Sequence, residues 1–162
     1  MKPITIMIVE DNDTMRLGMA ESLRREGYIV QEYPNGRDAL VNLNVIRPQL
    51  IITDLKMEPI DGLMLLSQVK SLNSAIEVLM ISAYGTIDIA VQAMQEGAAD
   101  FLTKPFSPEE LRIRVKKIVE KIQEKEKREL LEAENQFLQD VVNLPYDEII
   151  GQSAEMQKVF SI

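Results

Sequence analysis

The sequence predicts an α/β domain in which a parallel, doubly wound sheet carries helices on both faces. Short apolar runs alternate along the chain with segments whose apolar residues recur every three or four positions. This alternation is typical of buried strands joined by crossover helices. The runs cover residues 4–9, 28–33, 50–54, 78–82 and 100–103. We therefore expect five parallel strands, followed after residue 107 by an extended helix.

Helix-capping residues follow four of the runs and set the expected helix starts. The predicted helices begin at 12–14, 34–36, 61–62 and 86, and the first and fourth end near Gly27 and Gly97. The fourth carries an apolar stripe of Ile87, Val91 and Met94. Run 28–33 is half polar, which indicates a strand at the edge of the sheet.

Acidic side chains end two of the apolar runs. Glu10 and Asp11 follow run 4–9, and Asp54 closes run 50–54. Because the C-terminal ends of parallel strands share one rim of the sheet, where such folds bind ligands, we expect the three carboxylates to lie together. Hard oxygen donors of this kind suit Mg²⁺, held by one or two carboxylates plus water. The sequence therefore predicts a magnesium site.

The next two runs end in a hydroxyl and an ammonium group. Run 78–81 leads to Ser82, and run 100–103 leads to Lys104 and Pro105. An aspartate can accept a phosphoryl group as a carboxylate–phosphate anhydride, while Mg²⁺ and a lysine neutralise the charge on the equatorial oxygens. We interpret Asp54 as that acceptor.

This order of groups resembles the receiver domain of two-component response regulators, over roughly residues 3–121. The resemblance implies a flavodoxin-like (βα)₅ sheet with strand order 2-1-3-4-5. It implies that a sensor histidine kinase phosphorylates Asp54. It also implies that Mg²⁺ is bound directly by Asp11, through water by Glu10, and by the main-chain carbonyl of Lys56.

The same resemblance assigns switch roles. Ser82 is similar to the family's switch hydroxyl, Lys104 to its phosphoryl-contacting lysine, and Phe101 to its aromatic switch residue. The Lys104–Pro105 peptide is expected to be cis, as in the family.

The chain departs from the family pattern at a few positions. Glu10, Ser82 and Phe101 are common variants of Asp, Thr and Tyr. Glu58 is more unusual, because it stands directly after Met57 where the family places proline. An additional carboxylate there would either raise metal affinity or slow phosphorylation by repulsion, and the sequence leaves both effects open.

A long C-terminal helix is predicted from Ser107 and Pro108 onward. Its apolar residues recur at intervals of four, three and four, before and after an almost wholly charged stretch at 123–129. The first set is Leu111, Val115, Ile118 and Ile122; the second is Leu131, Leu138 and Val142, with the polar Asn135 on the same seam, and it ends at Leu144 and Pro145. One helix cannot bury such a stripe alone, so we expect a homodimer through a parallel coiled coil.

The dimer linker is assigned to residues 122–144, with Ile118 and Ile122 at its start and Asn135 setting its register. The alternative is a mobile amphipathic tail. This division leaves residues 1–121 as the phosphoacceptor domain.

Residues 145–162 resemble the opening of the AAA+ ATPase domain in sigma-54-dependent activators of the NtrC/DctD type, through Ile149, Ile150, Gly151 and Ser153. An unremarkable capped helix is the alternative. The chain contains no Gly-rich phosphate loop, so it is not expected to bind or hydrolyse ATP. The resemblance implies that the domain regulates an attached AAA+ domain and thereby transcription, either by relieving repression or by making a new contact.

Composition excludes several other functions. The chain has 162 residues, a net charge of −8, no cysteine and no histidine. Thiolate chemistry, Cys-bound zinc and a phosphohistidine within this chain are therefore excluded. The acidic balance argues against nucleic-acid contact, because such contact needs a basic surface. No apolar run reaches membrane-spanning length and none reads as a signal peptide, so a cytoplasmic location without membrane contact is expected.

Two other functions fit the sequence less well. A small Mg²⁺-dependent phosphatase with an aspartyl nucleophile would need a second Asp two residues after Asp54, where Lys56 stands. A binding module independent of phosphorylation would tolerate loss of the acidic cluster, which is present here.

Overall fold

A computed structural model of the chain describes residues 2–83 and 85–142. The chain divides into two compact units, residues 1–122 and 123–162. The segment 145–162, predicted to open an AAA+ domain, lies outside the described residues.

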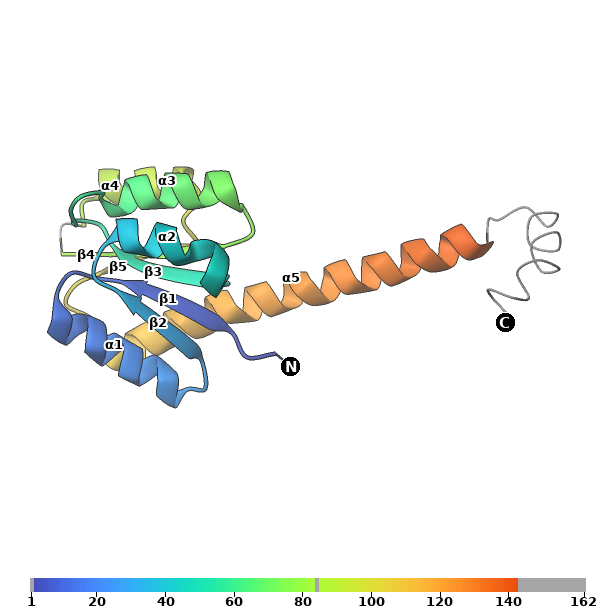
Figure 1. The fold of residues 1–162 in the computed structure, drawn as a ribbon, viewed down its shortest axis with the longest axis horizontal. Helices are drawn as coiled ribbons and strands as arrows, with labels where there is room; N and C mark the ends of the chain where they lie inside the picture. Colours follow the sequence, from blue (N-terminus) through green and yellow to red (C-terminus); the bar gives the residue numbers. More distant parts are fainter. Residues whose placement is uncertain (1, 84, 143–162) are drawn as a thin grey trace. The chain divides into compact units, whose positions relative to one another are not determined.

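The first unit is built on one parallel sheet with the predicted strand order (Figure 1). Its strands are β1 (Thr5–Val9), β2 (Ile29–Tyr33), β3 (Leu50–Asp54), β4 (Glu77–Ser82) and β5 (Asp100–Thr103), in the order β2-β1-β3-β4-β5. All five residues of β3 are buried, whereas β2 forms an edge and is partly exposed. Both observations follow from the sequence, since β3 is almost wholly apolar and β2 is half polar.

Helices cover both faces of this sheet (Figure 1). They are α1 (Asp13–Arg25), α2 (Gly36–Ile46), α3 (Gly62–Leu72), α4 (Ile87–Gln95) and α5 (Pro108–Val142). Side chains of α1 and of the first part of α5 form one core with the sheet, and side chains of α2, α3 and α4 form the other. The predicted N-caps are present: the side chains of Asn12, Asn35, Asp61 and Thr86 each accept a hydrogen bond from the first turn of the helix that follows.

The predicted apolar stripe of α4 faces solvent. Ile87 is 82% exposed, and Val91 and Met94 are each 48% exposed. The helix instead buries Ala93 and packs Ile89 against the core. Both sets of residues have helical spacing, so periodicity alone does not choose between them. We attribute the outcome to the small Ala93 side chain, which allows the helix backbone to approach the sheet closely.

The first part of α5 belongs to the core of the first unit. Its buried residues are Leu111, Val115, Ile118, Val119 and Ile122. All pack in the same core as α1, β1 and β3. This corrects the prediction that Ile118 and Ile122 begin the dimer linker, because their side chains are already covered. The first compact unit ends at residue 122, one residue after the predicted end of the phosphoacceptor domain.

The rest of α5 exposes its apolar side chains. Every side chain from Glu124 to Val142 is exposed. The predicted stripe through Leu131 and Leu138 is flanked by a second one through Leu130 and Phe137. A shallow, mostly apolar hollow is lined by Leu130, Ala133, Glu134, Phe137 and Leu138. Within the described residues, no helix is long and apolar enough to cross a membrane.

Candidate functional site

The C-terminal ends of four neighbouring strands bring the predicted site residues to one rim. Glu10 follows β1, Asp54 ends β3, Ser82 ends β4, and Lys104 follows β5. Glu10, Asp54 and Ser82 are buried, while Asp11 is exposed beside them. The parallel topology therefore assembles groups that are up to 94 positions apart in the sequence.

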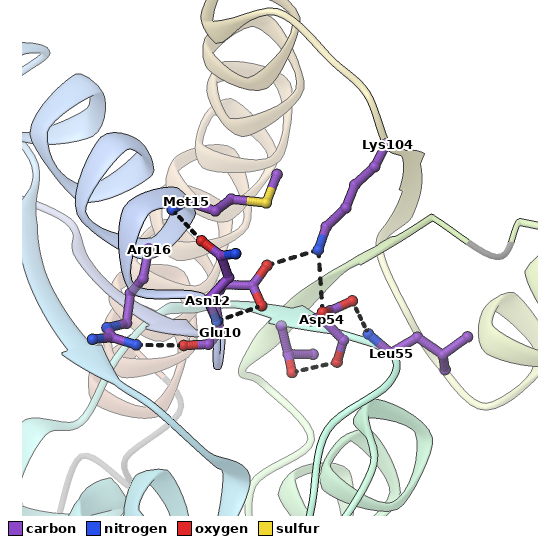
Figure 2. Close-up of polar contacts among 8 residues, drawn as sticks. Glu10, Asn12, Met15, Arg16, Asp54, Leu55 and Lys104 are labelled. Atoms are coloured by element: carbon purple, nitrogen blue, oxygen red, sulfur yellow. Dashed lines mark hydrogen bonds and ion pairs between the residues drawn. The ribbon is translucent and has the colours of Figure 1, made fainter.

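Lys104 joins the two buried carboxylates. Its Nζ donates to Glu10 Oε1 at 2.7 Å and to Asp54 Oδ2 at 3.1 Å (Figure 2). Its main-chain N–H donates to the carbonyl of Ser82 at 2.9 Å. The peptide to Pro105 is cis, as predicted. One ammonium group therefore partly neutralises two carboxylates that would otherwise repel each other.

The Asp54 carboxylate is held from two sides. Lys104 contacts Oδ2, and the main-chain N–H of Leu55 donates to Oδ1 at 2.8 Å (Figure 2). The same N–H also lies 2.9 Å from the carbonyl oxygen of Ile81 in β4. A carboxylate with donors on both oxygens has little rotational freedom, so its position is set before any ligand binds.

The loop after β1 is fixed by contacts that the sequence did not reveal. Arg16 donates to the main-chain carbonyl of Glu10 at 2.7 Å (Figure 2). It also forms an ion pair with Asp13 at 2.6 Å. The N–H of Asn12 donates to Glu10 Oε2 at 3.4 Å. Nothing in the sequence marks Arg16, because a basic residue in the first turn of a helix is usually solvated.

The acidic residues offer a suitable donor set for Mg²⁺. Glu10, Asp11 and Asp54 can each supply one oxygen, and these oxygens lie within 4.8 Å of one another. Hard oxygen ligands in such a group fit Mg²⁺, which commonly retains several waters. Lys56, Glu58 and Asp61 line an open hollow together with Asp11. Glu58 therefore adds negative charge next to the cluster, while a role for the Lys56 carbonyl stays a prediction.

The electrostatics of the site favour a charged lysine and a proton-binding Glu10. Burial raises the pKa of Glu10 from 4.5 to about 7, with a hydrogen bond to Asp11 and the charge of Asp54 adding to the effect and Lys104 opposing it. Burial lowers the pKa of Lys104, but Glu10 and Asp54 together outweigh burial and raise it above 10.5. The lysine is thus a permanent cation at neutral pH.

The predicted switch residues lie on β4, which pairs with β3, and on β5, which pairs with β4. In the sheet register, Asp54 is opposite Ile81, Met80 is opposite Phe101, and Ser82 is opposite Thr103. Phe101 is half-buried and packs against the core on the α2–α4 side. Ser82 therefore directly follows Ile81, the β4 residue opposite Asp54. Phe101 lies on β5, which pairs with the other side of β4.

Comparison with known proteins decides the family. Residues 6–116 match the response regulator receiver domain. The chain belongs to this family. Receiver domains bind Mg²⁺ at an acidic pocket, which agrees with the cluster described above. Over 112 residues the chain is 34% identical to sporulation initiation phosphotransferase F of Bacillus subtilis, covering 69% of this chain and 90% of that protein.

Longer similarities extend beyond the receiver domain. The chain is 31% identical over 157 residues to the DNA-binding transcriptional regulator NtrC of Salmonella typhimurium, covering 97% of this chain and 32% of that protein. NtrX from Brucella abortus has a similar structure, with a TM-score of 0.75 and 30% identity, covering 80% of this chain and 30% of that one. The chain thus spans about a third of the length of such regulators.

Proposed function

We propose that this receiver domain accepts a phosphoryl group from a sensor histidine kinase on Asp54, with Mg²⁺ as cofactor. The observation that carries the proposal is the geometry of Asp54: its carboxylate is held by Leu55 and Lys104 and lies beside the oxygens of Glu10 and Asp11. This combines a fixed nucleophile, a permanent cation and a place for a hard metal ion.

The chemistry follows from these positions. An oxygen of Asp54 forms the new bond to phosphorus while the bond from phosphorus to the donor nitrogen breaks, and that nitrogen regains a proton. Mg²⁺ held by Asp54, Asp11 and, through water, Glu10 would neutralise charge on the transferred group. Lys104 needs no large movement to help, because its Nζ already contacts Asp54.

Phosphorylation would then alter the contacts of the rim. The modification adds about two negative charges and three acceptor oxygens at Asp54. Lys104 would exchange its bond to Glu10 for one to the phosphoryl group, and the Ser82 hydroxyl would turn toward it. Phe101 would follow Ser82, so that the surface formed by α4, β5 and α5 changes. This sequence of events is the switch we propose.

The output would pass through the exposed length of α5. Leu131, Leu138 and Val142, with Asn135 among them, form the surface we propose for pairing with a second copy of the chain. Similarity to NtrC over 157 residues supports an attached regulator of transcription, here proposed to be a sigma-54-activating AAA+ domain. With a net charge of −8, the present chain is not proposed to contact nucleic acid.

A small phosphodonor tests the acceptor role. Acetyl phosphate with Mg²⁺ should add the mass of one phosphoryl group to the intact chain, and chelation of the metal should prevent the addition. Asp54→Asn should abolish it. Asp61→Asn is a matched control on the same rim, since asparagine still caps α3. Persistence of the added mass in Asp54→Asn would refute the proposal.

A further inference from the structure

Thr53 is a buried polar residue within an otherwise apolar strand. It lies directly before Asp54 in β3 and is fully buried. Its Oγ1 donates to the main-chain carbonyl oxygen of Asp54 at 3.0 Å. A valine or isoleucine would fill this core position without needing a partner. The hydroxyl is therefore directed at the backbone of the acceptor residue itself.

Gly62 approaches the same carbonyl from another element. It begins α3, and its N–H donates to the carbonyl of Leu55 at 2.7 Å. A Cβ atom at Gly62 would lie 2.4 Å from the carbonyl oxygen of Asp54 and 2.9 Å from the Cα of Leu55. Both neighbours are backbone atoms, which cannot move aside as a flexible side chain would. The carbonyl of Asp54 is thus confined between the Thr53 hydroxyl and the start of α3.

The confined carbonyl belongs to the peptide group that also holds the acceptor carboxylate. A peptide group is planar, so the direction of the Asp54 C=O fixes the direction of the Leu55 N–H. That N–H donates to Asp54 Oδ1 at 2.8 Å (Figure 2). A rotation of the peptide would turn the donor away from Oδ1 and remove one of the contacts that hold the carboxylate.

We propose that Thr53 and Gly62 are positioning residues, which orient the Asp54 carboxylate by fixing the Asp54–Leu55 peptide. The role in phosphorylation rests on the proposed function of Asp54. The competing interpretation is purely structural: the Thr53 hydroxyl donates to the nearest available acceptor inside the core, and this bond has no effect on the Asp54 carboxylate.

Two substitutions at Thr53 separate these interpretations. Thr53→Val keeps the shape and removes the hydroxyl, whereas Thr53→Ser keeps the hydroxyl. The first measurement is the amide resonance of Leu55 in the metal-free chain. We expect it to move in Thr53→Val and to stay near its wild-type position in Thr53→Ser. An unmoved resonance in Thr53→Val would overturn the positioning role, whether or not the chain accepts a phosphoryl group.

The second measurement is the rate of phosphorylation by acetyl phosphate at saturating Mg²⁺. Loss of one neutral hydrogen bond should slow Thr53→Val about three- to tenfold, with Thr53→Ser near wild type. The thermal unfolding midpoint reports whether either variant is merely less stable. A wild-type rate in Thr53→Val would show that the Thr53 hydroxyl does not affect phosphorylation of Asp54. No phosphorylation of the wild type would refute the proposed function instead, and the Leu55 resonance would still decide the positioning role.

Discussion

The two lengths of α5 repeat apolar residues at the same spacing but have different surroundings. From Pro108 to Ile122, the residues of the predicted stripe, Leu111, Val115, Ile118 and Ile122, pack in the core with the sheet and α1. From Glu124 to Val142, every side chain is exposed. The spacing therefore predicts a helix and its apolar stripe, but it does not predict which surface covers that stripe. The first length completes the domain that holds Asp54, and the second is available for a second chain.

Shortening the helix should have the largest effect, because it removes the proposed pairing surface altogether. We expect the full chain to sediment as a dimer and a chain ending at Gln123 as a monomer. Ending the chain at Lys121 would also remove Ile122 from the core and confuse the result. If both chains sediment as dimers, the receiver surface and not the helix makes the dimer; if both sediment as monomers, the proposed pairing is refuted.

Matched substitutions on the two lengths test the difference in burial. Ile118→Ala should lower the free energy of unfolding by about 2–5 kcal/mol, because it opens a cavity in the core. Leu138→Ala should change the stability of the receiver domain by less than about 0.5 kcal/mol, since the side chain is 58% exposed. Denaturant unfolding at a protein concentration low enough to keep the chain monomeric measures both. Similar losses would contradict the division at residue 122.

The buried acid of the first unit should make its stability depend on pH. Because Glu10 has its pKa raised from 4.5 to about 7, the folded metal-free chain retains a proton that the unfolded chain releases between these values. The contribution of this proton to the free energy of unfolding is fully present below pH 4.5 and is lost as the pH rises through 7.

Glu10→Gln should therefore be more stable than the wild type at about pH 8, by at most roughly 3 kcal/mol, with the difference disappearing below about pH 4.5. Glu134→Gln on the exposed length is the control and should leave stability unchanged at both pH values. Denaturant unfolding with a metal chelator present measures this. Parallel pH profiles for the wild type and Glu10→Gln would rule out the buried carboxyl as the cause.

The comparison of the two lengths of α5 also shows which features could be predicted from the sequence. The ends of apolar runs located Glu10, Asp54, Ser82 and Lys104, since parallel strands bring their C-terminal ends to one rim. The buried face of α4 was not predictable, because two sets of residues on that helix share helical spacing. The confinement of the Asp54 carbonyl was also hidden, because it depends on how closely α3 approaches β3. Sequence patterns specify the elements, and the distances between elements come from packing.

The most direct test of the account is to identify the residue that carries the phosphoryl group. Reduction of the acyl phosphate with borohydride converts the modified aspartate to homoserine, which peptide mapping by mass spectrometry can locate. After treatment with acetyl phosphate and Mg²⁺, we expect homoserine at position 54 and at no other acidic residue. Homoserine at position 11 or elsewhere, with Asp54 intact, would contradict the central claim.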